Sequence, residues 1–194
     1  DRPLTIFFAG EIGERKGVDV LVGALAKLGV SRDWRCTIAG NGDVAQFARA
    51  LADAGVAERV RFPGWIGMDE IHAGMLDADI VALPSRSEAL PISLIEGAAA
   101  GAAMVCTGVG ASAEINEHGV TGYVLPIEAD AFAEAFNELA ADRGKLSAMQ
   151  KAARTRYLER FTFARMLECL GEAYALVLEA KAASRAGARP SAAA

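Results

Sequence analysis

The sequence has few residues of the kinds that bind metals or form disulfides. It contains two histidines and three cysteines in 194 residues, and Cys36, Cys106 and Cys169 lie far apart. This spacing fits neither a zinc site nor a disulfide framework, so we expect three reduced cysteines in the core. His72 and His118 have no partners at ligand spacing, and no Ser-His-Asp or Cys-His set can be drawn. The composition therefore indicates neither a metal centre nor a catalytic triad.

A long apolar run and an excess of positive charge are also missing. No apolar segment reaches the eighteen or so residues that a membrane-spanning helix needs, and no signal peptide is visible after Asp1. The formal net charge is −5, which argues against a nucleic-acid partner and does not favour an anionic membrane surface. We therefore expect a cytoplasmic protein. A chain that opens directly on a strand looks like a piece of a longer protein.

The sequence does contain a regular alternation of strand and helix signals. Hydrophobic residues make up 53% of the chain, enough for one domain with a real core. This alternation predicts an α/β fold, a doubly wound parallel sheet of the Rossmann type with helices on both faces. Ligands of such sheets bind at the carboxyl ends of the strands. Apolar runs predict the strands themselves at 4–9, 34–39, 60–62, 79–83, 103–107 and 123–125.

From residue 129 onward the sequence is predicted to be helical. Apolar stripes at helical spacing mark a first helix from residue 129, a second over 143–157 and a third from Phe163. Residues 183–194 contain no large apolar side chain, which is typical of a disordered tail. We therefore expect one domain over residues 1–182 with C-terminal helices, followed by that tail.

The chain is organised around residues 84–101, which follow a buried strand. Pro91 suits the first turn of a helix, so Glu88 lies in the preceding loop and Glu96 on the helix itself. The free N–H groups at the helix start favour an anion between the two carboxylates. This combination fits a phosphorylated sugar or a nucleotide. Each carboxylate also has an ordinary explanation, because a glutamate often complements the helix dipole and loop glutamates are usually solvated.

A glycine-rich loop follows the first strand. Residues 10–17 read Gly-Glu-Ile-Gly-Glu-Arg-Lys-Gly, and a helical stripe comes next. A strand, a glycine-rich turn and a helix form the unit that cradles phosphate. Glycines such as Gly10 leave room for a ligand, and Lys16 supplies a cation. Residues 40–43, Gly-Asn-Gly-Asp, either belong to the same site or form a plain strand-to-helix turn.

The segment from Glu88 to Glu96 resembles the E-x7-E motif of family 4 retaining glycosyltransferases, which have the GT-B fold. Pro84-Ser85 before it, and residues 101–110 and 114–126 after it, fit the same pattern. The resemblance covers nearly the whole chain. It implies that the chain is the C-terminal, donor-binding half of a GT-B glycosyltransferase. The N-terminal acceptor domain, which is of similar size in the family, would be absent from this chain.

The resemblance also implies roles for individual residues. Glu96 would hold the ribose hydroxyls of a nucleotide-diphosphate sugar, and Glu88 would orient the sugar beside its anomeric carbon. Lys16 would stabilise the leaving diphosphate. Trp65 and Ile66 would lie near the base, although Trp65 could equally be a core residue. The leaving diphosphate would also be stabilised by the backbone amides of Ala89, Leu90, Pro91 and Ile92.

The sequence departs from the family pattern in the phosphate loop. Glu11 stands where the family usually has an arginine that grips the donor diphosphate, and a carboxylate there would repel a diphosphate. Arg15, or Arg86 in the loop before Glu88, could compensate, although Arg15 could equally be a solvated surface charge. Ala89 stands where the family most often has glycine, which narrows the loop slightly.

The resemblance implies a retaining hexosyltransferase that uses a UDP- or GDP-sugar and needs neither a cofactor nor a metal. Its acceptor would be a sugar or lipid-linked sugar, bound through the missing domain, in polysaccharide, glycolipid or related glycoconjugate synthesis. The full-length enzyme would be cytoplasmic or peripheral at the inner face of the membrane, and the isolated domain inactive. The alternative is a non-catalytic, degenerate nucleotide-sugar-binding module, which Glu11 favours. An epimerase or phosphorylase of this fold fits residues 84–126 less well.

Overall fold

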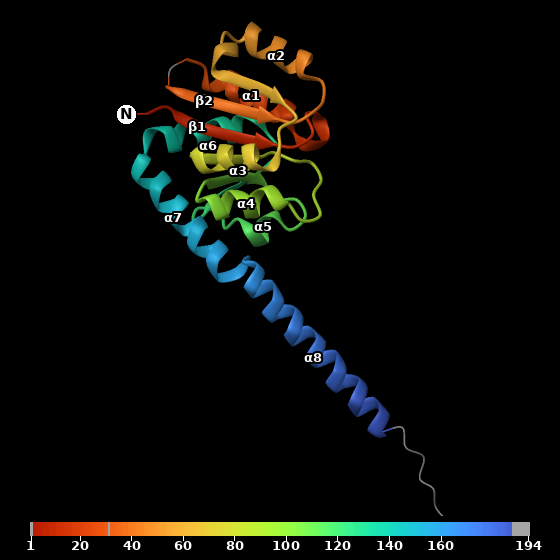
Figure 1. Ribbon diagram of the computed structural model, residues 1–194. Helices are drawn as coiled ribbons and strands as arrows, with labels where there is room; N and C mark the ends of the chain where they lie inside the picture. Colours follow the sequence, from red (N-terminus) through yellow and green to blue (C-terminus); the bar gives the residue numbers. More distant parts are fainter. Residues whose placement is uncertain (1, 31, 188–194) are drawn as a thin grey trace, which may run out of the picture. The chain divides into compact units, whose positions relative to one another are not determined.

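The computed structural model describes residues 2–30 and 32–187, with side chains as far as residue 181. Within this part of the chain, six strands form one parallel sheet (Figure 1). The order of the strands reverses between β1 and β4, which confirms the predicted doubly wound sheet. In the order of pairing they are β3 (Val60–Gly64), β2 (Trp34–Ala39), β1 (Leu4–Ala9), β4 (Ile80–Leu83), β5 (Ala103–Thr107) and β6 (Gly122–Leu125).

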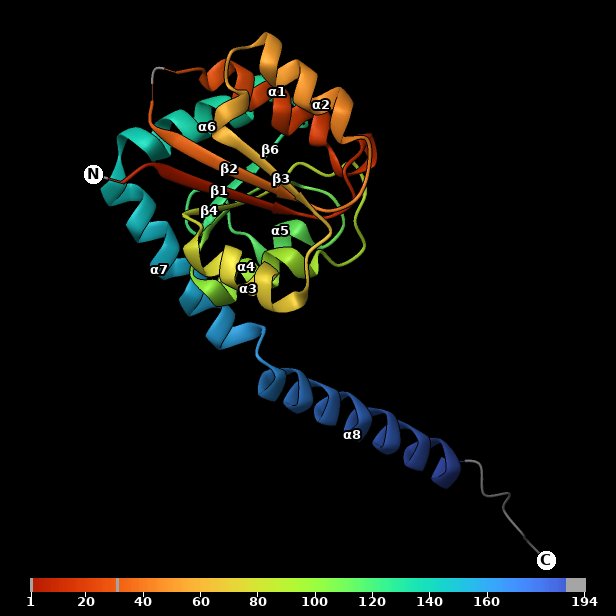
Figure 2. The same ribbon diagram turned by 45° about the horizontal axis from the view of Figure 1, so that its top comes forward.

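Helices cover both faces of this sheet (Figure 2). Because of this cover, β4 is apolar along its whole length, and every residue of β4 and β5 is buried. One face carries α1 (Val18–Leu28), α2 (Val44–Asp53) and α6 (Ala129–Ala141). The other carries α3 (Met68–Asp77), α4 (Ile92–Ala100) and the short α5 (Ser112–Ile115). Single 3-10 turns, η1 (Glu14–Lys16) and η2 (Ala57–Arg59), precede α1 and β3.

Most predicted boundaries lie within a residue or two of the observed ones. α7 (Arg143–Arg160) continues past the predicted end at residue 157, and β3 continues past residue 62 to Gly64. β3 therefore includes Pro63, which has no N–H for a sheet hydrogen bond. The edge position of β3 tolerates this proline, because the strand pairs only with β2 in the described sheet.

The chain divides into two compact units after Tyr157, and α8 (Phe163–Gly187) belongs to the second. α8 begins as predicted, with the Thr162 hydroxyl accepting from the Arg165 N–H at 3.2 Å. It runs past the predicted boundary at residue 182, and residues 188–194 of the predicted tail lie outside the described residues. Its predicted apolar stripe is about half exposed or more: Phe163, Met166, Leu167, Leu170, Tyr174, Val177 and Leu178. No described helix is both long and apolar enough to cross a membrane.

The three cysteines differ in exposure. Cys36 on β2 and Cys106 on β5 are buried, as predicted, whereas Cys169 on α8 is exposed, so its prediction as a core residue is wrong. Burial raises the pKa of the Cys106 thiol to about 11 and also raises the pKa of Cys36. The thiolate is the reactive form, so both buried cysteines should resist alkylation.

We expect iodoacetamide at pH 8 to modify Cys169 alone in the folded chain, and all three cysteines after unfolding in urea. Peptide mass spectrometry over a time course measures this directly. Modification of Cys36 or Cys106 at a rate near that of Cys169, with the chain still folded, would contradict the burial of these thiols.

Candidate functional site

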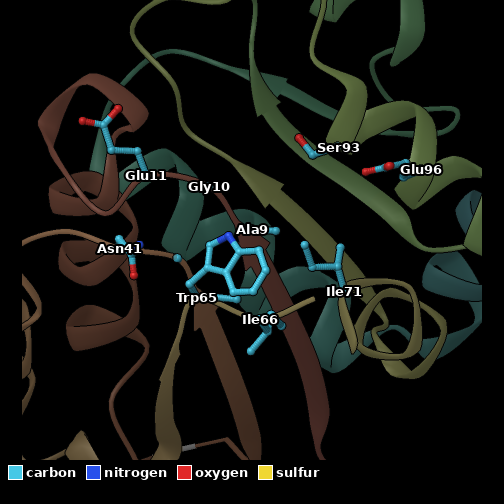
Figure 3. A pocket seen from close by; sticks show the side chains of 11 residues that line it. Ala9, Gly10, Glu11, Asn41, Trp65, Ile66, Ile71, Ser93 and Glu96 are labelled. Atoms are coloured by element: carbon cyan, nitrogen blue, oxygen red, sulfur yellow. The ribbon is translucent and has the colours of Figure 1, made fainter. Parts of the chain in front are cut away.

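The loops after β1, β2 and β3, together with α3 and α4, surround a pocket at the carboxyl edge of the sheet (Figure 3). Its volume is about 420 Å³. It lies where the strand order reverses, the position at which open α/β sheets bind ligands. Its lining combines small residues, apolar side chains and two carboxylates: Ala9, Gly10, Glu11, Ala39, Gly40, Asn41, Trp65, Ile66, Ile71, Ser93 and Glu96.

Glycines let the loops after β1, β2 and β3 pack directly on one another. Gly10 N–H donates to the Ala39 carbonyl at 3.0 Å, and Gly40 N–H donates to the Gly64 carbonyl at 2.8 Å. Gly40 has φ +144°, and a Cβ there would lie 1.7 Å from the Gly10 carbonyl oxygen. A Cβ on Gly42 would meet the Ile12 carbonyl in the same way. The turn at residues 40–43 is therefore required by the packing of the pocket floor.

Trp65 is a pocket residue and is absent from the core. Its side chain is 74% exposed and lies beside Ile66 and Ile71 at the pocket (Figure 3). Of the two predicted alternatives, the structure excludes the buried aromatic. A largely exposed indole beside two isoleucines presents a flat apolar surface on which a planar ring can stack.

Glu96 lies on the first turns of α4, with its carboxylate at the pocket. Ser93, one turn earlier on the same helix, also lines the pocket (Figure 3). His72 Nε2 on α3 is 3.8 Å from Glu96 Oε1. Sequence analysis could not predict this neighbour, because the two residues lie on different helices and only the fold brings them together.

Lys16 and Glu88 form an ion pair next to this pocket. Lys16 Nζ is 2.6 Å from Glu88 Oε1, and their side chains are only 19% and 9% exposed. The Ser85 hydroxyl donates to the same carboxylate oxygen at 2.7 Å. Gly17 makes the pairing possible: it has φ +70°, and a Cβ there would lie 1.8 Å from the Pro84 carbonyl oxygen. Sequence analysis named both Lys16 and Glu88 but could not predict that they form an ion pair.

The start of α4 is close to Glu88 in the chain. Pro91 is the N-cap, without a side-chain cap, and its carbonyl accepts from Leu94 N–H at 3.0 Å. Proline has no N–H, so including Pro91 among the amide donors is wrong, and Ala89, Leu90 and Ile92 are the residues that can donate. The Ala89 carbonyl accepts from Ala111 N–H at 3.1 Å, which fixes the loop.

Both arginines expected to compensate for Glu11 have acidic partners. Arg15 Nη2 is 2.6 Å from Glu11 Oε2 itself, and both side chains are more than half exposed. Arg86 makes two bonds of 2.7 Å to the Asp19 carboxylate. The hydrogen bond from Arg86 holds the pKa of Asp19 below its ordinary value. Arg15 and Arg86 are therefore absent from the pocket lining.

Two further features bear on binding chemistry. Among the described residues, no three His, Cys, Asp or Glu side chains lie close enough to hold a metal ion. Ser112 is buried inside the first turn of α5, whose N-cap is Ala111. Within the part of the chain that the structure describes, no group hydrogen-bonds the Ser112 hydroxyl.

Comparison with known families identifies this architecture. The sequence model of the family described as glycosyl transferases group 1 matches residues 1–156. The chain belongs to this family. A GDP-mannose-dependent alpha-(1-6)-phosphatidylinositol monomannoside mannosyltransferase from Mycobacterium tuberculosis is 35% identical over 164 residues, 79% of this chain and 42% of the relative. The chain thus spans less than half the length of this relative.

Solved glycosyltransferase structures share the fold. The C-terminal domain of a glycosyl transferase group 1 family protein (LpcC) from Francisella tularensis superposes with a TM-score of 0.77 at 21% identity, covering 84% of this chain and 89% of that domain. Anabaena Alr3699/HepE, in complex with UDP and glucose, superposes with a TM-score of 0.80 at 22% identity, covering 90% of this chain and 48% of that protein. This group 1 chain has the fold of the C-terminal domain of a GT-B glycosyltransferase, as predicted.

The structure divides the predicted site residues of this group 1 chain into two sets. Gly10, Trp65, Ile66 and Glu96 line the pocket together. Glu88 and Lys16 form the neighbouring ion pair, close in the chain to Ala89 and Leu90 in the loop and to Ile92 at the start of α4. Sequence analysis did not single out the lining residues Ile71 and Ser93, and it named Asn41 only as part of the turn at residues 40–43. Ser93 could have been found from its place one turn before Glu96 on α4.

Proposed function

We propose that this chain binds the nucleotide-diphosphate sugar donor of a retaining hexosyltransferase. The observation that carries the proposal is the joining, in one pocket, of an exposed tryptophan, a helix-borne carboxylate and a glycine-lined floor. These three features match the three chemical parts of a nucleoside phosphate: a planar base, a ribose diol and a phosphate chain.

The nucleoside half would occupy the pocket itself. The base would stack on Trp65 beside Ile66, where an aromatic ring and a base each offer an apolar face. The ribose hydroxyls would donate to the carboxylate of Glu96. A hydrogen bond to a charged group contributes roughly 1.5–3 kcal/mol, so Glu96 should account for a large share of nucleotide affinity.

The diphosphate and the sugar would lie toward the ion pair. Gly10 leaves the backbone open on one side, and the amides of Ala89, Leu90 and Ile92 at the start of α4 would donate to phosphate oxygens on the other. The Lys16 ammonium group would lie beside the leaving diphosphate and stabilise its developing negative charge. Such electrostatic stabilisation is often the largest contribution to catalysis. Glu88 would orient the sugar beside its anomeric carbon.

The donor would be a UDP- or GDP-sugar. Support for the nucleotide comes from two proteins that this chain resembles, Anabaena HepE in complex with UDP and glucose and the GDP-mannose-dependent mannosyltransferase of Mycobacterium tuberculosis. The reaction would retain anomeric configuration and need no metal. The acceptor, a sugar or lipid-linked sugar, would bind a further domain, and this chain alone would bind donor without transferring it.

Titration calorimetry of the chain with UDP, GDP and ADP tests the proposal. We expect one nucleotide to bind selectively, and Glu96→Ala to weaken it by roughly tenfold to hundredfold, since one charged hydrogen bond is lost. Glu134→Ala is the matched control, because Glu134 is an exposed glutamate on α6, outside the pocket.

Equal binding by the wild type and Glu96→Ala would contradict the ribose role of Glu96. No binding of any nucleotide, with the control variant and wild type both folded, would contradict the donor site in this chain.

A degenerate, non-catalytic module is the second candidate. Glu11 favours it, because this carboxylate occupies the loop at the pocket and holds Arg15 in an ion pair. Such a module would still bind a nucleoside through Trp65 and Glu96 but would bind the diphosphate weakly. Substitution of Glu11 distinguishes the two candidates.

A further inference from the structure

Glu88 lies in a segment without regular secondary structure, between the end of β4 and the start of α4. A side chain in such a segment takes its orientation from tertiary contacts, because no helix or strand fixes the backbone around it. The contacts of the Glu88 carboxylate therefore decide how accurately it can face a sugar.

Two donors hold one oxygen of this carboxylate. Glu88 Oε1 accepts from Lys16 Nζ at 2.6 Å and from the Ser85 hydroxyl at 2.7 Å. Neither bond is made to the second oxygen, Oε2, of this carboxylate. The two donors differ in freedom. Lys16 has a flexible four-carbon stem and three N–H donors, whereas Ser85 is fully buried and has a single O–H.

Ser85 is itself fixed by its surroundings. The hydroxyl of Thr107, at the end of β5, donates to the Ser85 carbonyl, and both side chains are buried. Ser85 is therefore connected through Thr107 to the central sheet. Lys16 lies in the 3-10 turn η1 of the glycine-rich loop.

We propose that Ser85 is the positioning residue of Glu88: it holds the carboxylate in place for the donor sugar when Lys16 turns toward the diphosphate. The proposal rests on the proposed function, since it assumes that Lys16 meets phosphate and Glu88 meets sugar. A lysine that leaves Oε1 for a phosphate oxygen would release Glu88 if it were the only donor. The buried Ser85 would keep its hydrogen bond to Oε1 throughout, and the hydrogen bond from Thr107 would hold Ser85 in position.

The test separates sugar binding from nucleotide binding. Calorimetry compares UDP with UDP-glucose and GDP with GDP-mannose for the wild type and for Ser85→Ala. We expect Ser85→Ala to weaken the sugar nucleotide by about tenfold and to change the free nucleotide by less than twofold. A merely structural role would weaken both compounds alike.

Two further variants sharpen the test. Thr107→Val keeps the shape of the side chain and removes the hydroxyl that fixes Ser85, so it should reproduce the same selective loss to a smaller extent. Ser112→Ala is the matched control: this serine is equally buried, and among the described residues no group hydrogen-bonds its hydroxyl. It should bind both compounds as the wild type does.

Each remaining outcome decides a specific point. An unchanged sugar-nucleotide affinity in folded Ser85→Ala, or an equal loss for both compounds, overturns the role of Ser85 and leaves the proposed function standing. Equal affinity of the wild type for the free nucleotide and the sugar nucleotide also overturns the role of Ser85, because Glu88 then makes no contact with the sugar. A wild type that binds neither compound overturns the proposed function, and this inference with it.

Discussion

Replacement of Asp79 with alanine is expected to lower the free energy of unfolding by about 3 kcal/mol. Asp79 is 3% exposed at the start of β4. An ionised carboxylate at this depth is costly unless each oxygen is paired, and here both oxygens have partners.

The partners of Asp79 come from two parts of the chain. Its Oδ1 is 2.6 Å from Arg2 Nη2, and its Oδ2 accepts from Thr5 N–H at 3.0 Å. Arg143 Nη1 on α7 lies 3.3 Å from Oδ2, and Gln150 donates to the Asp79 backbone carbonyl at 3.2 Å. The carboxylate thus connects the start of β1, the start of β4 and α7 at the edge of the sheet opposite the pocket.

Urea unfolding of three variants measures this contribution. Asp79→Asn keeps an acceptor for the Thr5 N–H but cannot pair with the arginines, so it should lose about half as much as Asp79→Ala. Asp77→Ala is the control, because Asp77 is exposed and, within the described residues, its carboxylate has no recorded hydrogen bond or ion pair. It should stay within about 0.5 kcal/mol of the wild type. A loss below about 1 kcal/mol in Asp79→Ala would show that water replaces these contacts.

The contrast between Asp79 and the strand that follows it shows what the sequence could predict. The run at 79–83 predicted a buried strand, observed as Ile80–Leu83, because a central parallel strand needs apolar residues on both faces. The same run gave no hint that the carboxylate at its start pairs with Arg2 and Arg143, which lie 77 and 64 residues away. Periodicity reports on local backbone structure, whereas a buried ion pair depends on which distant segments the fold brings together.

In the candidate site, too, contacts between distant segments could not be predicted from the sequence. Glu88 and Glu96 could be predicted from their spacing around the start of a helix, and Lys16 from its glycine-rich loop. The bond between Lys16 and Glu88 could not, because it crosses from the loop after β1 to the loop after β4. The pair between Glu11 and Arg15 could not be predicted from helical spacing either, because Glu11 precedes the 3-10 turn Glu14–Lys16 that contains Arg15.

That last pair leads to the largest difference in affinity between the two candidate functions. In a degenerate module, Glu11→Arg should strengthen the binding of UDP or GDP by about a hundredfold, close to 2.7 kcal/mol, whereas in a working donor domain this gain should be absent. The substitution removes a negative charge at the pocket, adds a positive one, and releases Arg15 from its 2.6 Å bond to the Glu11 carboxylate. All three changes favour a diphosphate, because unit charges a few ångströms apart near a protein surface interact by several kcal/mol before screening. Arg86 cannot already supply this charge without leaving Asp19.

Calorimetry of a graded series tests this expectation. Glu11→Gln removes the carboxylate charge and frees Arg15 without adding a new cation, so it should gain about tenfold. Glu14→Arg makes the same change in net charge on an exposed residue of the same loop outside the pocket lining, and its effect reports only long-range attraction. The gain of Glu11→Arg should also shrink as salt is raised, because exposed charges are screened.

The outcome of this series decides between the two candidate functions. A large gain for Glu11→Arg, with little for Glu14→Arg, marks a phosphate subsite whose donor affinity has been lost to Glu11 and supports the degenerate module. No gain, or a loss, means that Arg15 already leaves Glu11 for the diphosphate when the donor binds. An exposed ion pair contributes only about 0–1 kcal/mol, so this exchange would cost little. In that case the pair of Glu11 and Arg15 replaces the arginine that the family usually has at position 11, and the transferase proposal stands.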